Sequence, residues 1–159
     1  MGRKHHRSVA FVEQARIEFV MLANHAEAIN GLLYIAGGGW ADHRRVIVLG
    51  QPVPPSPISI ALSLYIPWND TNRPHALSVT VESEDGAVLF KVDASLNTGR
   101  PPQLPPGAPQ NPALAFNGIV TYPKAGGYRV IAKLNGDQDT RTWPFRVHDI
   151  PQQQSQIAS

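Results

Sequence analysis

The sequence predicts an all-β protein, an antiparallel two-sheet β-sandwich of about eight strands. Three observations predict this fold class. Apolar and polar residues alternate with period two in several segments, turn-forming residues separate those segments, and two proline-rich connections interrupt the series. With 15 prolines and 13 glycines among 159 residues, the chain disfavours long helices. Its length suits a single domain with a substantial core.

The alternation defines the strands and the face that each one buries. In residues 57–66 the isoleucines and leucines point to one side and the serines to the other, which is typical of a half-buried antiparallel strand. The expected strands are 16–29, 32–40, 57–66, 75–83, 87–93, 113–122, 128–135 and 141–148. The predicted core contains Ile60, Leu62, Leu64, Leu77, Val79, Tyr128, Val130, Phe145 and Val147, whereas Ser59, Ser63, Thr80 and Lys133 are expected at the surface.

The turns agree with this order of strands. Asn30-Gly31 predicts a type I′ hairpin between the first two strands, because both central residues of that turn need a positive φ. Glu84-Asp85-Gly86 predicts a second hairpin, and residues 135–140 connect the last two strands. The only helical candidate is the segment 8–16, with Ser8 as its N-cap.

Two longer connections predict how the chain moves between sheets. Residues 50–57 and 98–112 are dense in proline, so we expect extended crossings from one sheet to the other. Near the end, Gly126-Gly127-Tyr128 precedes a terminal hairpin, as in immunoglobulin-like sandwiches. In that architecture the tyrosine hydroxyl hydrogen-bonds back to the preceding corner.

Charge and composition predict the domain organisation. We expect a flexible basic N-terminal tail at 1–14, one β-sandwich domain at 15–149 and a flexible C-terminal tail at 150–159. The net charge is +2, but Arg3, Lys4 and Arg7 supply three of the 14 basic residues, so residues 8–159 carry 11 bases against 12 acids. The domain itself therefore has no basic surplus for specific nucleic-acid binding. The absence of cysteine, of a membrane-length apolar run and of a signal-peptide core predicts a cytoplasmic protein.

The run Gly37-Gly38-Gly39 raises the possibility of a phosphate-binding loop. The residues that follow, 40–50, show no helical pattern, and the Gly-Lys-Ser/Thr of a Walker loop is absent. Glycines at a strand end instead favour a sharp exit or a close backbone approach. We therefore interpret this run as backbone geometry.

Four motifs occur together over about residues 16–149: the hairpin that ends in GGGW, the PWND loop with His75, the proline-rich crossing and the terminal Gly-x-Tyr hairpin. In these motifs the chain resembles a family of short uncharacterised bacterial proteins from actinobacteria and related groups. The resemblance implies a compact β domain and brings no substrate, cofactor or catalytic residue.

Few residues are candidates for chemistry. His25 and Glu27 lie two apart and share a strand face, as a metal pair or an acid–base pair would, or as two solvent-facing residues would. Asp70 and Asn72 have calcium-loop spacing without the remaining acidic ligands, and such residues more often hold a turn. There is no cysteine nucleophile and no GxSxG motif, so we predict no catalytic residue, metal ligand or cofactor.

The favoured function is a non-catalytic binding or protein-interaction domain whose protein or peptide partner is unidentified. The predicted binding residues lie at the exits of two strands, which are expected at one end of the sandwich, where aromatic and hydrogen-bonding groups meet: Trp40, Asp42, His43, Trp68, Asn69, Asp70, Arg73 and His75. One alternative is a metal-binding domain or metal-dependent enzyme that uses His25, Glu27, His43, Asp70 or His75. Another is a structural subunit of a larger assembly, such as a phage particle.

Overall fold

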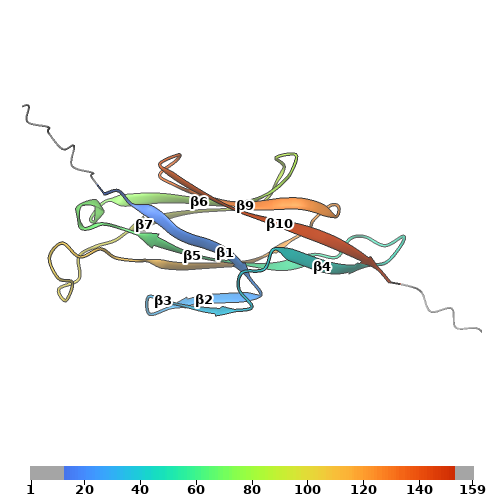
Figure 1. Ribbon diagram of the computed structural model, residues 1–159, viewed down its shortest axis with the longest axis horizontal. Helices are drawn as coiled ribbons and strands as arrows, with labels where there is room; N and C mark the ends of the chain where they lie inside the picture. Colours follow the sequence, from blue (N-terminus) through green and yellow to red (C-terminus); the bar gives the residue numbers. More distant parts are fainter. Residues whose placement is uncertain (1–12, 153–159) are drawn as a thin grey trace, which may run out of the picture.

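The computed structural model describes residues 13–152, and it confirms the all-β sandwich (Figure 1). One sheet has three strands in the order β1-β5-β8, and the other has five in the order β4-β10-β9-β6-β7. A separate two-stranded hairpin, β2-β3, completes the fold. The strands are β1 (Arg16–Ala23), β2 (His25–Ile29), β3 (Leu32–Ala36), β4 (Asp42–Ile47), β5 (Ser56–Tyr65), β6 (Pro74–Ser83), β7 (Val88–Asn97), β8 (Ala113–Val120), β9 (Gly126–Leu134) and β10 (Asp139–Pro151). The immunoglobulin-like subtype stays a prediction.

The sheets are antiparallel except at one edge. There β4 runs parallel to the end of β10, with His43 opposite Val147 and Ile47 opposite Pro151. β4 was not among the expected strands, because its residues Asp42 to Arg45 are polar and show no apolar alternation. This pairing also corrects the predicted C-terminal boundary at 150, since Ile150 and Pro151 still belong to β10.

The structure differs most from the prediction in the first two expected strands. The segment 16–29 divides at Asn24 into β1, which pairs with β5, and β2, which pairs with β3. The segment 32–40 ends at Ala36, because Gly37 and Gly39 adopt positive φ and turn the chain away. No helix forms in the described part of the segment 8–16, since Glu13 to Ala15 have no regular structure and Arg16 begins β1; residues 8–12, like most of both predicted tails, lie outside the described residues.

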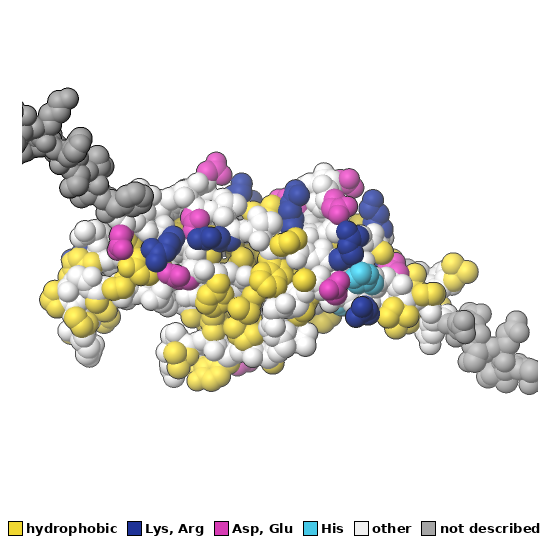
Figure 2. Space-filling view, viewed as in Figure 1, with side chains coloured by type: hydrophobic (Ala, Val, Ile, Leu, Met, Phe, Trp, Pro, Cys, Tyr) yellow, Lys and Arg dark blue, Asp and Glu magenta, His cyan; other side chains and the backbone are white. Residues whose placement is uncertain are grey.

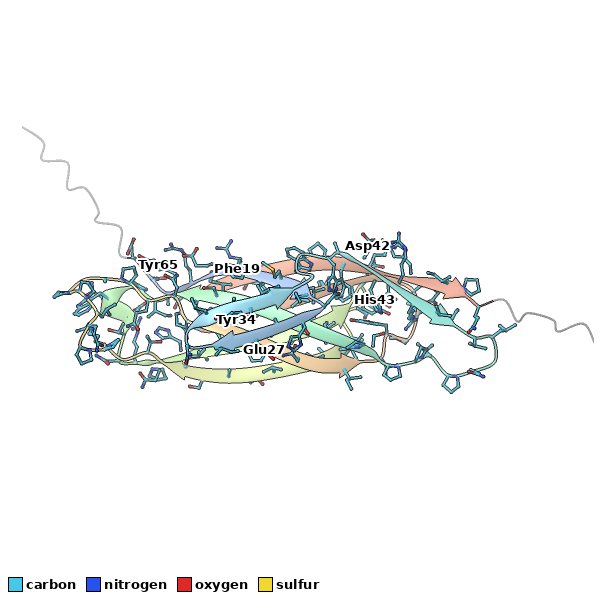
Figure 3. All side chains as sticks on the ribbon, turned by 90° about the horizontal axis from the view of Figure 1, so that it is seen from below. Phe19, Glu27, Tyr34, Asp42, His43 and Tyr65 are labelled. Atoms are coloured by element: carbon cyan, nitrogen blue, oxygen red, sulfur yellow. The ribbon has the colours of Figure 1, made fainter. Side chains whose placement is uncertain are left out.

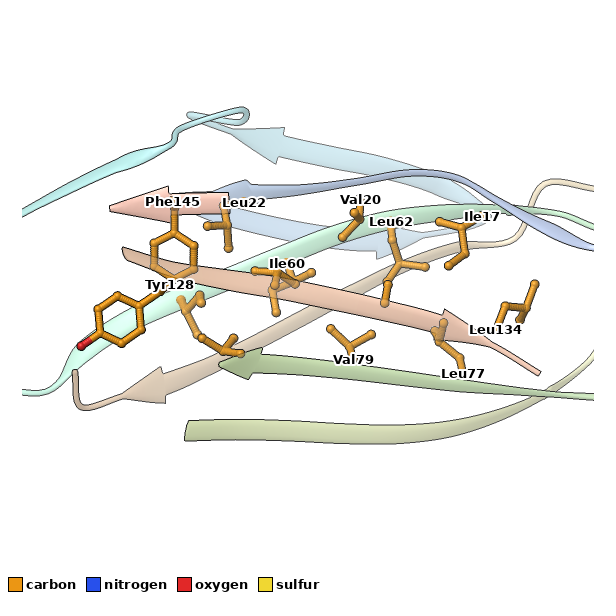
Figure 4. Packing of buried hydrophobic residues seen from close by; sticks show 14 of the residues in the cluster. Ile17, Val20, Leu22, Ile60, Leu62, Leu77, Val79, Tyr128, Leu134 and Phe145 are labelled. Atoms are coloured by element: carbon orange, nitrogen blue, oxygen red, sulfur yellow. The ribbon is translucent and has the colours of Figure 1, made fainter. Parts of the chain in front are cut away.

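The core lies between the two sheets and matches the predicted faces (Figure 4). All nine predicted core residues are buried. Lys133 is exposed as expected and Thr80 is half-buried, but Ser59 and Ser63 are buried, so their predicted exposure is wrong. The reason is a third layer: β2 packs on β5 and β8, so part of the outer face of the three-stranded sheet is covered rather than solvated.

The connections confirm the predicted crossings. Residues 48–55 lead from β4 in the five-stranded sheet to β5 in the three-stranded one, and residues 98–112 lead from β7 to β8. The second crossing is folded rather than extended, because Leu104 N–H donates to Pro101 O and Ala108 N–H donates to Pro105 O. The predicted tyrosine corner is confirmed, since Tyr128 Oη donates to Lys124 O at 2.6 Å.

Candidate functional site

The predicted binding residues do not form one site. His43 lies at 3.0 Å from the hydroxyl of Ser56, at the start of β5, whereas Trp68 follows the end of the same strand. A ten-residue strand spans roughly 30 Å. Figure 3 accordingly shows Asp42 and His43 toward one end of the molecule and Tyr65 toward the other. The hypothesis of a shared rim is wrong, because β3, which precedes Trp40, and β5, which precedes Trp68, end at opposite ends of the sandwich.

At the Trp68 end, the polar groups hold the backbone together. The buried Asp70 carboxylate accepts the Ala15 N–H at 2.7 Å and also bonds Arg73. The imidazole of His75 is buried; its Nε2 lies 2.7 Å from Asp70 O and its Nδ1 lies 2.9 Å from the amide nitrogen of Asn135. Burial, and secondarily the Arg73 charge, lower the pKa of His75. These contacts favour a turn-holding role for Asp70 and His75.

Trp68 and Asn69 belong to a short 3₁₀ turn, Trp68–Asp70. The Arg100 guanidinium lies over the Trp68 ring at 4.0 Å and donates to Trp68 O at 2.8 Å. Thr71 Oγ1 donates to the same carbonyl at 2.7 Å. Asn69 is exposed. The Trp68 ring is therefore already paired within the chain, and ligand binding by this loop remains a prediction.

At the opposite end, Trp40, Asp42 and His43 do come together, at the base of the β2–β3 hairpin. With Asn24 and Arg44, they line a shallow surface pocket. His148, at 2.7 Å, donates to the Asp42 carboxylate. Sequence analysis could not single out His148, because its proximity to Asp42 comes from the parallel β4–β10 pairing.

The His43–Ser56 pair resembles the start of a nucleophilic site, but its setting differs. Ser56 is buried, and no carboxylate in the described chain hydrogen-bonds His43. Burial, and secondarily the charge of Arg45, lower the pKa of His43. The imidazole is therefore neutral and paired to a hydroxyl that substrate does not reach, which is a structural arrangement rather than an acyl-transfer one.

Arg45 anchors this end of the sandwich from beneath. Its Nε donates to Asp149 and its Nη1 donates to Tyr122 O, both at 2.6 Å. Burial raises the pKa of the Tyr122 phenol, which stays neutral among the rings of Tyr128 and Phe145. The guanidinium thus joins β4, β10 and the segment before β9, and we assign it to the packing of this end.

The surface that sequence analysis did not single out is the hairpin itself. Cross-strand partners share a face, so Glu27 with Tyr34 and Ile29 with Leu32 all point away from the sandwich. Leu32 is 61% exposed, Tyr34 54% and Ile29 45%. Asn30-Gly31 predicts this hairpin, but nothing in the alternation indicates that it stands apart as a third layer.

The remaining metal candidates are also placed. His25 and Glu27 lie on this outward face and bond each other at 3.0 Å, with both side chains more than half exposed. Within residues 13–152 no three His, Cys, Asp or Glu side chains gather as a metal site would require. No helix of this described part is long and apolar enough to cross a membrane.

The glycine run confirms the geometric interpretation. Gly39 N–H donates to Leu22 O at 2.7 Å, and Asn24 N–H donates to Ala36 O at 3.0 Å. A Cβ at Gly38 would lie 2.7 Å from Ile35 Cγ2 and 3.1 Å from Met21 Sδ. The run therefore returns the chain from the hairpin to the sandwich with a positive φ at Gly37 and Gly39 and a close approach of other side chains at Gly38.

Comparison with known proteins identifies a family. The model of a family of unknown function, DUF6941, matches residues 18–148. No curated protein gives a significant match. Among solved structures, a candidate beta-galactosidase from Bacteroides fragilis aligns with a TM-score of 0.48 and 13% identity, over 83% of this chain and 17% of its own. A beta-glucuronidase from glycoside hydrolase family 2 aligns with a TM-score of 0.39 and 14% identity, over 60% of this chain and 10% of its own. The chain thus spans less than a fifth of either protein.

Proposed function

The chain belongs to DUF6941, a family of unknown function, and we propose from its own surface that it is a non-catalytic protein-interaction domain. The binding surface in this proposal is the outward face of the β2–β3 hairpin with the adjoining outer face of β1. We call it the hairpin face; it comprises Phe19, Ile29, Leu32 and Tyr34.

One observation carries the proposal: exposed apolar side chains are concentrated on this side of the molecule. Six of the ten large hydrophobic residues that are exposed in the described chain belong to the hairpin or to the outer face of the sheet that carries it: Phe19, Ile29, Leu32, Tyr34, Ile35 and Ile119. Figure 2 shows hydrophobic side chains over β1 and the hairpin, with most charged ones over the strands of the other sheet. Concentrated apolar surface of this kind marks interaction sites.

The hairpin is held in place before any partner arrives. Asn117 Nδ2, on β8, donates to Ala26 O at 2.9 Å, and Ala26 is fully buried against Ala23 and Ala61. The hydrogen bond from Gly39 to Leu22 closes its base. A preorganised surface loses little conformational entropy on binding, which favours affinity.

The chemistry of this face indicates the kind of partner. Residues 24–39 contain no Lys, Arg or Asp, and their one acid, Glu27, is bonded to His25. Nucleic acids and anionic membranes require basic groups, so the proposed partner is a protein with an uncharged apolar surface. The cytoplasm is the proposed compartment, supported by a sequence without cysteine.

The test compares three proteins as bait in extracts of the source organism. The double variant Leu32→Ser/Tyr34→Ser removes apolar area from the hairpin face. The control variant, Val88→Ser, removes an apolar side chain of β7 whose exposed fraction, 54%, equals that of Tyr34. We expect wild type and Val88→Ser to retain the same protein, and the hairpin variant to bind it at least about tenfold more weakly, a difference of roughly 1.4 kcal/mol. Unchanged melting temperatures establish that the fold persists.

Two results would contradict the proposal. One is equal retention of the partner by the hairpin variant, which would move the binding surface elsewhere. The other is co-sedimentation of the wild-type protein with lipid vesicles that depends on Leu32 and Tyr34, which would assign the apolar face to a membrane.

A further inference from the structure

Three asparagines of the chain are followed directly by glycine: Asn30, Asn117 and Asn135. An asparagine in this position is prone to spontaneous deamidation, because glycine has no Cβ to hinder its amide nitrogen as that nitrogen approaches the side-chain carbonyl of asparagine. The fold places the three pairs in different surroundings, and these surroundings determine which of them reacts.

Asn30 lies at the free end of the hairpin, in the two-residue turn that is closed by the pairing of Ile29 with Leu32 (Figure 1). Asn30 and Gly31 are both exposed. Within residues 13–152, no hydrogen bond holds either the side-chain amide of Asn30 or the N–H of Gly31. A Cβ at Gly31 would meet no atom within 4 Å, so the space around the turn is open. The amide is therefore able to rotate toward the Gly31 nitrogen.

Asn135 is a matched comparison, because its backbone conformation is nearly the same. Its φ is 50°, as at Asn30, and the glycine that follows has a φ of 70°, against 77° in the hairpin turn. The side chain of Asn135 is nevertheless held at both ends. Its Oδ1 accepts the Ala76 N–H at 2.9 Å, and its Nδ2 donates to Nδ1 of the buried His75 at 2.9 Å. The amide cannot turn toward the next nitrogen without losing both bonds.

Asn117 is restrained in a similar way within β8. Its Nδ2 donates to Ala26 O at 2.9 Å, and its Oδ1 accepts from the hydroxyl of Ser59 at 2.5 Å. The backbone is restrained as well, since Asn117 and Gly118 pair with Ser59 and Ile58 of β5. The fold therefore opposes both the side-chain rotation and the change of backbone torsion that ring closure requires.

We propose that Asn30 is a site of spontaneous deamidation in the folded protein, and that their hydrogen bonds protect Asn117 and Asn135. The Gly31 nitrogen loses its proton and attacks Cγ of Asn30. The new C–N bond closes a succinimide ring, while the Cγ–Nδ2 bond breaks and ammonia leaves with that proton. Water then adds to one of the two ring carbonyls and opens the ring. Opening at Cγ gives aspartate, and opening at the main-chain carbonyl gives isoaspartate.

Either product changes the hairpin. A carboxylate that is ionised at neutral pH appears on the segment 24–39, whose one acid is Glu27 and which contains no Lys or Arg. Isoaspartate also routes the main chain through the former side chain, which adds a methylene to the turn between Ile29 and Leu32. The inference stands apart from the proposed function, because it concerns the chemistry of the turn and needs no partner.

The three sites are compared within one protein. The purified full chain is incubated in mildly alkaline buffer and digested, and mass spectrometry measures the deamidated fraction of each Asn-Gly peptide. We expect Asn30 to react at least about tenfold faster than Asn117 and Asn135, since each of these must first break two hydrogen bonds. In concentrated urea the fold is lost, and the three rates should become similar. Equal rates at Asn30 and Asn135 in native buffer would overturn the inference, as would a contrast that persists unchanged in urea.

Two variants assign the reaction to the residues named. Asn30→Gly keeps the turn, because glycine adopts positive φ, and it should abolish the acidic species that ion-exchange chromatography resolves for wild type. His75→Ala removes one partner of Asn135, so deamidation should accelerate there and stay unchanged at Asn30. Leu77→Ala, on the same strand, leaves both partners of Asn135 in place and is the matched control. An Asn30→Gly protein that acidifies at the wild-type rate would contradict the site, and no acceleration in His75→Ala would contradict the protective role of the hydrogen bonds.

Discussion

At the scale of single residues, the polar groups that most resemble a recognition site form hydrogen bonds within the chain. His75 has both ring nitrogens occupied, one toward Asp70 O and the other toward Asn135 Nδ2. The amide nitrogen of Asn135 is a donor, so Nδ1 must accept, and Nε2–H donates to the carbonyl. This pattern requires the neutral imidazole, and a second proton at Nδ1 would face a donor.

The pH dependence of stability follows from that tautomer. Because burial lowers the pKa of His75 in the folded state, the unfolded chain binds a proton first as pH falls below about 6.5, and stability should decrease from pH 7 toward pH 5. His75→Ala should lower the free energy of unfolding at pH 7 and flatten this decrease. Urea unfolding across the pH series measures both effects.

A matched substitution separates titration from packing. Leu77→Ala removes a buried side chain of the same strand that carries no proton. It should lower stability while leaving the slope with pH as in wild type. A slope that His75→Ala does not change would show that other groups cause the acid sensitivity.

At the scale of elements, the hairpin is a third layer made possible by small side chains. Ala23, Ala26 and Ala61 meet where β2 crosses the outer face of the three-stranded sheet, with Ala115 packed against them. Alanines permit the close approach of the two layers that larger residues would prevent. Asn117 then links the layers, since it donates to Ala26 O and accepts from Ser59 Oγ at 2.5 Å.

Removal of that link should loosen the hairpin while the sandwich stays closed. Asn117→Ala leaves Ala26 O and the buried Ser59 hydroxyl with one partner fewer, at a cost of about 1–3 kcal/mol. Amide hydrogen exchange should therefore accelerate in β2 and β3 and remain slow in β5 and β9. Equal acceleration in all four strands would mean that the hairpin and the sandwich open as one unit.

At the scale of the whole molecule, stability comes from the core between the two sheets. Leu62 lies in the central strand of the three-stranded sheet and is fully buried, facing the β6–β9–β10 side of the core (Figure 4). Leu62→Ala should cost about 2–4 kcal/mol through lost transfer energy and a residual cavity. Ile119→Ala, 71% exposed on β8, should stay within about 0.5 kcal/mol. Thermal unfolding of both variants measures the contrast, and similar losses would contradict the assigned faces.

The sequence by itself determined the fold class and the faces of the central strands. In β6 and β9 the side chains alternate with period two because successive Cβ atoms point to opposite sides of the sheet, so local pattern and burial coincide. Asn30-Gly31 and Tyr128 were equally predictable, since a turn or a corner requires its residue types within a few positions of the chain.

Only the tertiary structure determined which segments of the chain are neighbours in space. The segment 16–29 contains no glycine or proline to mark a break at Asn24, yet the partner strand changes there, and pairing partners are not encoded in the sequence of a single strand. Ser59 reads as solvent-facing until a third layer covers it. Trp40 and Trp68 read as neighbours because both follow strands, but the direction of each strand in its sheet separates them by the length of the sandwich. Proximity between distant segments is a property of topology, which the local physics of each segment leaves open.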